Sequence, residues 1–332
     1  MQQITIKQVD AFTSVPFGGN PAGLVTEASG LSRDLMQRIA AEMSMSETAF
    51  ISRATRPDAS FRILFFTPTE EYDTSGHVLI AASFALAEEG RVELIDGITR
   101  ITYETNTGTV SVDVHFSPGD DSSTSESAID GGVPLCAGQD RAGILEKIVL
   151  NQEVHGHERS RIPIPEIAAI LGVREKEITK TGLPIEIIST GLRQLMIPMD
   201  RKETVTGMHP DLIKLSLMNK RYGIDTNHIY SLDTYGPGSI TYSRHFAPKL
   251  GMWEDAATGT AAAGLGTYLL RHGVTASGKM LMEQGREETN LAKILVEIDE
   301  SDRSYSSAAI GGLAVTSISR TAELGESGLT IS

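Results

Sequence analysis

The sequence has a single cysteine, Cys136, among its 332 residues. One cysteine cannot form an internal disulfide bond, which fits a reducing compartment. Long apolar runs are also missing, because the longest stretch, from Val78 to Ala87, is far too short to span a bilayer. The first residues, MQQITIKQVD, are polar and lack the apolar core of a signal peptide. We therefore expect a cytoplasmic protein with no membrane partner.

Basic residues are scarce relative to acidic ones, with 29 Lys and Arg against 43 Asp and Glu and a formal net charge of −14. No local Lys/Arg cluster offsets this charge, so we expect no nucleic-acid partner. The negative net charge does not exclude a small anionic substrate, because helix N-termini and backbone N–H groups can bind an anion inside a cleft.

Several sequence fingerprints of cofactor and hydrolase sites are absent. There is no G-x-G-x-x-G, no G-x-x-x-x-G-K-[ST] and no G-x-S-x-G. His155 and His157 flank a glycine in a polar linker, but no Cys or carboxylate motif of ligand spacing accompanies them. We expect neither a cofactor nor a metal.

The length and the hydrophobic pattern predict a mixed α/β protein of two domains. A chain of 332 residues fits two domains of roughly 150 residues each, and 40% hydrophobic and 22% charged residues are average for a packed fold. Runs rich in β-branched residues predict many strands: Ile4–Phe12, Thr48–Ser52, Phe61–Phe66, Val110–Phe116, Ile185–Ser189, Ile229–Leu232, Ile294–Ile298 and Leu313–Ile318. Two helical patterns are predicted: one through Leu35, Ile39 and Met43 after a Ser32 cap, and one through Leu212 and Leu215 with Pro210 in its first turn.

An internal repeat is the most informative feature of the chain. RILFFTPTEEYDTSGHVLIAASFALAEEG begins at Arg62, and RHFAPKLGMWEDAATGTAAAGLGTYLLRHG begins at Arg244. Aligning Gly76 with Gly259 also aligns other pairs: Glu71 with Glu254, Leu86 with Leu269 and Gly90 with Gly273. The shared order of elements indicates two homologous halves.

Each copy of the repeat has a strand, an acidic turn, a glycine and then a helix of small side chains. Such a helix packs closely on every side. We therefore expect an α/β (α+β) fold with two pseudo-symmetric domains, each a rolled β-sheet or barrel around its own central helix. The predicted domains are 1–155 and 156–332, with the boundary between about residues 117 and 165; it stays open whether the last strand pairs back to the first domain. The polar segment Gly119–Gly132 is predicted to be an exposed loop.

The two acidic turns bring glycine and polar residues to a helix N-terminus. They are Asp73–His77 and Glu254–Thr260. Free N–H groups and the helix dipole favour an anion there. Ordinary N-capping by the Asp, Ser or Thr residues of these turns is the alternative. The dipole should keep His77 neutral, as a hydrogen-bond donor or acceptor for a ligand, unless it is simply a satisfied polar residue.

Two further segments carry candidate residues. MSMSETAFI, from Met43 to Ile51, places Glu47 between a helix end and an apolar strand, where partial burial suits a carboxylate to acid/base work. A solvent-facing glutamate at the start of a strand is the alternative. The glycines of FGGNPAG, from Phe17 to Gly23, either let the backbone approach a ligand closely or only form a turn.

Taken together, five segments resemble the phenazine-biosynthesis PhzF-like family of the diaminopimelate epimerase superfamily. They are VDAFTSVPFGGNPAG, MSETAF, the acidic turn ending in SGH, STG (Ser189–Gly191) and EDAATGT, in family order from residue 9 to residue 260. The resemblance implies two similar domains, each a sheet rolled around a central helix, with the active site between them and commonly a homodimer. It implies Glu47 as the acid/base residue. The other implied site residues are Ser46, Gly76, His77, Asp255, Gly259 and Thr260, with Asn20 lining the cleft.

The resemblance also bears on the type of reaction. Racemases and epimerases of the superfamily use a pair of cysteines, but here Ser75 takes one of these places and EDAATGT contains no cysteine. A serine hydroxyl is too weakly acidic to replace a thiol without a dedicated partner, which argues against two-cysteine racemisation. Where family members often have Pro-His after STG, this chain has Leu192-Arg193-Gln194; a buried or cleft-facing Arg193 would favour a different anionic group.

The sequence therefore predicts a cofactor-independent isomerase. A single carboxylate, Glu47, would move a proton within a small carboxylic acid in the interdomain cleft, while His77 and Asp255 orient and protonate the substrate. The helix ends, with Ser75 and Gly76 in one half and Gly259 in the other, would hold the substrate carboxylate. Two alternatives stay open: a non-catalytic small-molecule binding protein with the same cleft, and a cysteine-type epimerase using Cys136.

Overall fold

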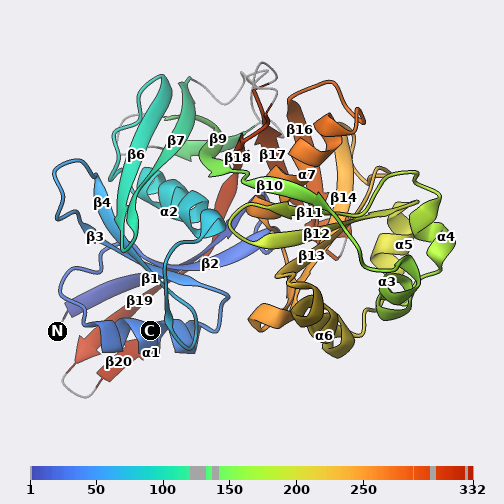
Figure 1. Cartoon of the computed structure of the whole chain (residues 1–332). Coiled ribbons are helices and arrows are strands. Elements are labelled where there is room, and N and C mark those ends of the chain that lie inside the picture. Colours follow the sequence, from blue (N-terminus) through green and yellow to red (C-terminus); the bar gives the residue numbers. More distant parts are fainter. Residues whose placement is uncertain are drawn as a thin grey trace. The chain divides into compact units, whose positions relative to one another are not determined.

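The computed structural model describes residues 2–119, 132–136, 142–286, 288–299, 304–325 and 328–331. It divides into two compact units, which are coloured along the chain in Figure 1. Unit 1 comprises Met1–Leu150 and Gly311–Ser332, and unit 2 comprises Asn151–Ile310. The loop predicted at Gly119–Gly132 lies outside the described residues except for its first and last positions.

Among its described residues, unit 1 contains two helices and a run of paired strands. The helices are α1 (Arg33–Met43) and α2 (Gly76–Glu88). The strands are β1 (Gln2–Ala11), β2 (Asn20–Val25), β3 (Thr48–Arg53), β4 (Phe61–Phe66), β5 (Glu71–Tyr72), β6 (Gly97–Thr105), β7 (Gly108–Pro118), β8 (Val133–Cys136), most of β9 (Ala142–Glu153), β19 (Ala314–Gly325) and β20 (Gly328–Ile331). β1 lies between β2 and β19 and is antiparallel to both, so the last part of the chain pairs with the first.

Unit 2 contains five α-helices among its described residues. These are α3 (Ile164–Leu171), α4 (Glu175–Thr179), α5 (Lys202–Gly207), α6 (Leu212–Tyr222) and α7 (Gly259–Arg271). Its strands are β10 (Gly156–Arg159), β11 (Glu186–Ser189), β12 (Arg193–Met199), β13 (Thr226–Ser231), β14 (Ser239–Ala247), β15 (Met252–Asp255), β16 (Lys279–Gln284), β17 (Ala292–Glu297) and the first part of β18 (Ser307–Gly312).

The strand pairing repeats from one unit to the other. In unit 1, β1–β2 is antiparallel, β2–β3 parallel, β3–β4 antiparallel, β4–β6 parallel and β6–β7 antiparallel. In unit 2, the same order runs through β11–β12, β12–β13, β13–β14, β14–β16 and β16–β17. In each unit a short strand and a helix of 13 residues follow the fourth strand of this series. The sequence repeat is therefore a repeat of the fold.

The two repeated helices begin and end at equivalent positions. α2 starts at Gly76 and α7 at Gly259, the glycines that the sequence repeat aligns. Each is followed by a left-handed glycine, Gly90 with φ 66° and Gly273 with φ 64°. A residue with a side chain adopts this conformation only with strain, so glycine ends both helices at the same place.

Small side chains let both helices pack closely, as the sequence predicts. Every residue of α2 from Val78 to Ala87 is buried, and the helix contacts β1, β2, β3, β7 and β19. Every residue of α7 from Ala261 to Leu269 is buried, with contacts to β11, β12 and β17. A Cβ atom at Gly266 would lie 2.9 Å from a side-chain carbon of Val296. A larger residue there would displace its neighbour.

Local sequence signals account for α1 and, with one correction, for α6. The Ser32 side chain accepts a hydrogen bond from the Leu35 N–H, as expected of an N-cap. The placement of Pro210 in the first turn of α6 is wrong. Asp211 is the N-cap, and its carboxylate accepts from the Lys214 N–H at 3.0 Å, so Pro210 lies one residue before the cap.

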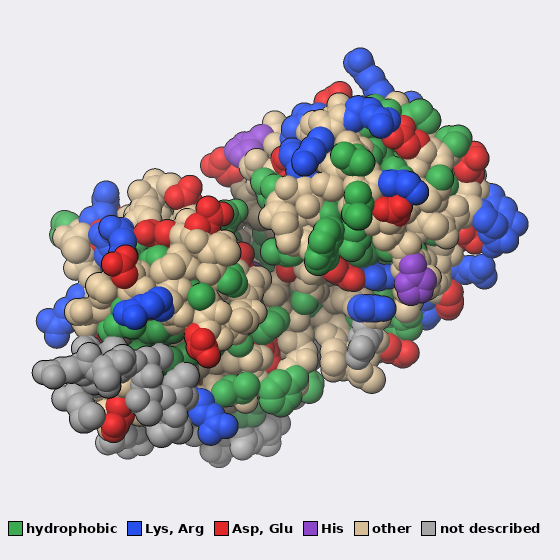
Figure 2. Space-filling view, turned by 90° about the horizontal axis from the view of Figure 1, so that it is seen from below, with side chains coloured by type: hydrophobic (Ala, Val, Ile, Leu, Met, Phe, Trp, Pro, Cys, Tyr) green, Lys and Arg blue, Asp and Glu red, His purple; other side chains and the backbone are tan. Residues whose placement is uncertain are grey.

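Two observations concern the surface and the length of the helices. Figure 2 shows basic and acidic side chains interspersed over the face that it presents. Within the described ranges, no helix is long and apolar enough to cross a membrane.

Candidate active site

Glu47 and His77 face each other in unit 1. Glu47 directly precedes β3, where its carbonyl oxygen accepts a hydrogen bond from the Gly23 N–H at 3.0 Å, and His77 is the second residue of α2. Their side chains are 12% and 10% exposed, and His77 Nε2 lies 3.4 Å from Glu47 Oε2. The alternative of a solvent-facing Glu47 is therefore wrong.

One polar atom of each side chain stays without a hydrogen bond despite this contact. In the described part of the chain neither Glu47 Oε2 nor His77 Nε2 makes a hydrogen bond of ordinary geometry, and both atoms are buried. The adjacent Ser46 Oγ is also buried and has no such partner. A buried polar atom left unpaired costs about 1–3 kcal/mol, so a ligand or an ordered water that pairs with these three atoms would be bound favourably.

Ser75 is the N-cap residue of α2, but its side chain does not cap the helix. Its Oγ lies 3.2 Å from His77 Nδ1 instead. At α7 the N-cap residue Thr258 also makes no capping bond, because its hydroxyl donates to Asp255 Oδ2 at 2.5 Å. Neither N-cap side chain therefore caps its helix.

The start of α2 has space beside it within unit 1. Among the described residues, a Cβ atom at Gly76 would meet one atom within 4 Å, Leu150 Cδ1 at 3.9 Å. Packing inside unit 1 therefore does not require glycine at this position. Its small size instead leaves room for another group to approach the helix N-terminus.

Unit 2 holds the equivalent turn rigidly through Gln284, which is 1% exposed. Its Oε1 accepts from the Thr258 N–H at 3.0 Å, and its Nε2 donates to Asp255 O at 2.9 Å and to Thr258 Oγ1 at 3.1 Å. Asp255, Gly259 and Thr260 are half-buried at this turn. Sequence reasoning missed Gln284, which comes from the end of a different strand and carries no motif of its own.

Glu254, which the repeat aligns with Glu71, holds a buried arginine. Its carboxylate accepts two hydrogen bonds from Arg244, at 2.7 Å from Nε and 2.9 Å from Nη2. Arg244 is 4% exposed. Its Nη1 donates to backbone carbonyls, those of Val205, Thr206 and Met208. The pair of Glu254 and Arg244 therefore links β15 to β14 and to these three carbonyls. Asp255 is the carboxylate beside the start of α7.

Tyr72 is a further residue near Glu47 that the sequence analysis did not select. Burial, and then the negative charges of Glu47 and Asp73, raise the pKa of its phenol. The phenol therefore stays protonated and can donate a hydrogen bond. Its position in the acidic turn TEEYD was the one signal available in the sequence.

The FGGNPAG turn has a structural explanation. Asp10 Oδ2 accepts a hydrogen bond from the Phe17 N–H at 2.6 Å. Gly19 has φ 56°, and a Cβ atom there would lie 2.1 Å from Ala11 O. The turn therefore requires this glycine without any ligand. Asn20, the next residue, is 3% exposed and opens β2 opposite Ala11.

Other residues that the sequence singled out lie elsewhere. Arg193 is not buried: its side chain is 43% exposed and donates to Gly223 O at 2.9 Å and Glu158 Oε2 at 3.2 Å. His155 Nδ1 lies 3.8 Å from Glu153 Oε2. Within the described ranges, no three His, Cys, Asp or Glu residues are arranged to hold a metal. Cys136 ends β8, and its side chain lies outside what the structure describes.

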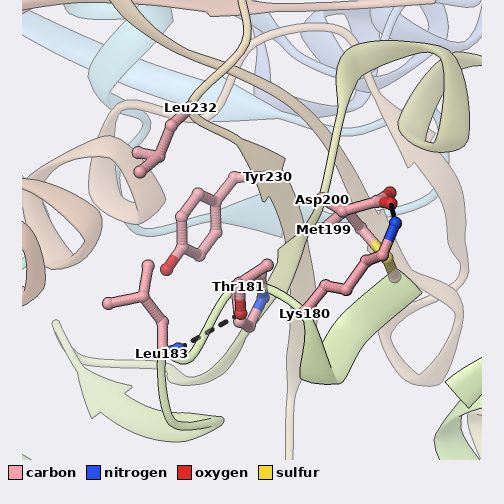
Figure 3. Close-up of a pocket in the computed structure, with 8 residues that line it drawn as sticks. Lys180, Thr181, Leu183, Met199, Asp200, Tyr230 and Leu232 are labelled. Atoms are coloured by element: carbon pink, nitrogen blue, oxygen red, sulfur yellow. Dashed lines mark hydrogen bonds and ion pairs between the residues drawn. The ribbon is translucent and has the colours of Figure 1, made fainter. Parts of the chain in front are cut away.

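A separate cavity of about 470 Å³ lies in unit 2 (Figure 3). None of the predicted site residues lines it; its lining residues are Lys180, Thr181, Leu183, Pro198, Met199, Asp200, Tyr230 and Leu232. The Tyr230 ring lies 5.9 Å from that of Tyr268, which is nine residues beyond Gly259 in α7. At 1.5 Å per helical residue, Tyr268 lies about 13.5 Å along α7 from Gly259, so the cavity, which Tyr230 lines, is not at the start of that helix. It is therefore distinct from the Asp255 turn.

Comparison with known proteins identifies the family. The family model for phenazine biosynthesis-like proteins (PhzC-PhzF) matches residues 9–320. The chain belongs to this family. The resemblance inferred from the sequence motifs is thereby confirmed.

Relatives and a solved structure extend the match over nearly the whole chain. An uncharacterized isomerase of Salmonella typhimurium is 31% identical, over 93% of this chain and 95% of its own length. Trans-2,3-dihydro-3-hydroxyanthranilate isomerase of Pseudomonas aeruginosa is 29% identical, over 93% and 92%. The crystal structure of a PhzF-family protein from Bacillus anthracis is 26% identical, with a TM-score of 0.79 over 97% of this chain and 99% of that one. This protein is an isomerase with the α+β fold of the PhzF family.

Proposed function

We propose that this protein moves a proton within a small carboxylic acid without a cofactor, using Glu47 as its single acid/base carboxylate. The observation that carries the proposal is the buried contact between Glu47 and His77, whose facing atoms have no hydrogen bond of ordinary geometry. Structural residues of an interior are normally satisfied by their own chain. Buried polar atoms without a hydrogen bond are suited to bind a polar group of a substrate.

The chemistry follows from what each group can donate or accept. Glu47 takes a proton from one carbon and returns it to another carbon on the same face, as general base and then as general acid. His77 donates a hydrogen bond to Glu47 or to a polar substrate group. The substrate carboxylate binds at the uncapped N-terminus of α2, where Gly76 leaves space.

The second half of the proposed site is the Asp255 turn of unit 2. Its support is local: Gln284 fixes the turn, and the N-cap side chain of α7 leaves the helix N-terminus uncapped. We propose that Asp255, Gly259 and Thr260 also bind a substrate group at the start of α7, and that each unit is a sheet closed around its central helix. The two units have the same strand order, which supports the proposal that both are built in this way.

The test is proton exchange. The protein is incubated in D₂O with a panel of cyclic and unsaturated carboxylic acids, including a dihydro-hydroxyanthranilate because that compound appears in the name of the Pseudomonas aeruginosa relative. NMR then follows moved double bonds and incorporated deuterium. We expect Glu47→Gln to lower turnover by a factor of roughly 100 to 10,000, the usual contribution of general acid/base catalysis.

Glu42→Gln is the matched control, because Glu42 is exposed on α1 and close in sequence. It should leave turnover unchanged. Retention of full turnover by Glu47→Gln would refute the assignment of Glu47. Saturable binding with no exchange, unaltered in Glu47→Gln, would instead establish a non-catalytic binding protein.

A further inference from the structure

We infer that Ser75 is a positioning residue that holds the His77 ring through Nδ1, so that the histidine presents Nε2–H to Glu47. The inference rests on the proposed function, because it gives Ser75 a role in orienting the acid/base pair. It goes beyond the expectation of Ser75 as a substrate contact, and it is carried by the contacts of the two His77 ring nitrogens, one with Ser75 Oγ and one with Glu47 Oε2.

The two ring nitrogens of His77 have different neighbours. Nδ1 lies 3.2 Å from Ser75 Oγ, and Nε2 lies 3.4 Å from Glu47 Oε2. A neutral imidazole carries one N–H and one bare nitrogen, so one neighbour receives a donor and the other an acceptor. A serine hydroxyl satisfies either form, whereas an ionised carboxylate can only accept.

Charge decides between the two forms. With Glu47 ionised, as a general base must be, a bare Nε2 would place its lone pair against a carboxylate oxygen. The other form gives Nε2–H directed at Glu47, while Ser75 Oγ–H donates to Nδ1. This arrangement keeps a donor beside Glu47 for the carboxylate or for the substrate.

The position of Ser75 explains why a hydroxyl serves here. It occupies the N-cap of α2 with extended backbone angles, φ −145° and ψ 121°, and makes no capping bond to the helix. Its side chain is thereby available to His77, two residues along the chain. A neutral hydrogen bond of this type favours the ring orientation that it holds by a factor of roughly two to ten.

The first test needs no substrate. Long-range ¹H–¹⁵N NMR of the full-length protein, labelled at histidine nitrogen, reports which ring nitrogen of His77 carries the proton; a His77→Gln spectrum identifies the signals. We expect Nε2–H in the resting wild-type protein, a changed Nδ1 chemical shift in Ser75→Ala because the hydrogen bond to Nδ1 is lost, and the wild-type pattern in Ser75→Thr, which keeps the hydroxyl. Nδ1–H in the wild type, or an unchanged pattern in Ser75→Ala, would overturn the inference.

The second test uses the substrate found by the exchange assay. Ser75→Ala should lower kcat about tenfold with little change in KM and alter the pH profile of kcat, and Ser75→Thr should restore both. A rise in KM alone would show that Ser75 is only a substrate contact and would refute the positioning role. The two proposals fail separately: full turnover of Glu47→Gln refutes the role of Glu47, whereas the tautomer measurement judges Ser75 by itself.

Discussion

Acid should destabilise unit 2 through two histidines that face each other in its interior. His228 in β13 and His245 in β14 are paired across the strands, with their Nδ1 atoms 3.2 Å apart. They are 1% and 2% exposed. Burial lowers the pKa of His228 to about 3. Burial, and then the neighbouring His228, lower the pKa of His245 well below its usual value.

The sign and size of the effect follow from proton linkage. In the unfolded chain each histidine titrates near pH 6.5, so below that pH the unfolded state binds protons that the folded state does not. Stability is therefore fully present above about pH 6.5 and is lost as the pH falls towards the folded-state pKa of about 3. Between about pH 7.5 and 5.5 the free energy of unfolding should fall by about 1.4 kcal/mol through His228 alone, and by roughly twice that through the pair.

Urea unfolding across this pH range measures the effect. Far-UV circular dichroism follows the whole chain, and the fluorescence of Trp253, the one tryptophan in the sequence, follows unit 2. His228→Asn should flatten the pH dependence by about 1.4 kcal/mol across the range, whatever its effect on absolute stability. His209→Asn, which changes an exposed histidine of unit 2, is the control. An unchanged slope in His228→Asn would refute the reasoning.

Two further predictions concern Arg244 and Gly76. Arg244→Met should destabilise unit 2 by about 3–5 kcal/mol in urea unfolding, because it leaves the Glu254 carboxylate without its partner at a largely buried site. Arg100→Met, which breaks a two-bond pair whose arginine is 65% exposed, should cost no more than about 1 kcal/mol; equal losses in the two variants would contradict the argument. Gly76→Ala should leave the melting temperature within a few degrees of the wild type, since the nearest atom is 3.9 Å from the added Cβ, yet abolish turnover in the exchange assay. Full activity of Gly76→Ala would show that no substrate group approaches this helix end.

The repeated helices illustrate what could be predicted from the sequence. Glycine at the start, small residues through the middle and glycine after the end are local signals, and they placed the starts of α2 and α7 at the turns Asp73–His77 and Glu254–Thr260, where the structure has them. Each of the eight predicted strand runs overlaps a strand of the structure, because β-branched runs between turn residues are a local strand signal, whereas strands without such a run were missed. The contact between Glu47 and His77 has no such local signal, because 30 positions of sequence separate the two residues. Only the fold brings these residues to 3.4 Å.

The errors and omissions have physical causes that local patterns do not contain. Pro210 suits a first helical turn, but the Asp211 carboxylate accepts the Lys214 N–H and fixes the start of α6 one residue later. The Arg193 side chain lies at the surface because its guanidinium donates hydrogen bonds to Gly223 O and Glu158 Oε2. Gln284 escaped notice because its role depends on the turn that lies next to the end of its strand.

The pairing of β1 with β19 bears on how the chain is made. Unit 2 is a continuous segment, Asn151–Ile310, whereas unit 1 requires Gly311–Ser332 to complete its sheet. During synthesis the inserted unit can reach its final contacts while one edge of β1 still awaits Ala314–Gly325. A nascent or C-terminally truncated chain would therefore display an open edge strand, a site of mispairing with other chains, until the last residues leave the ribosome.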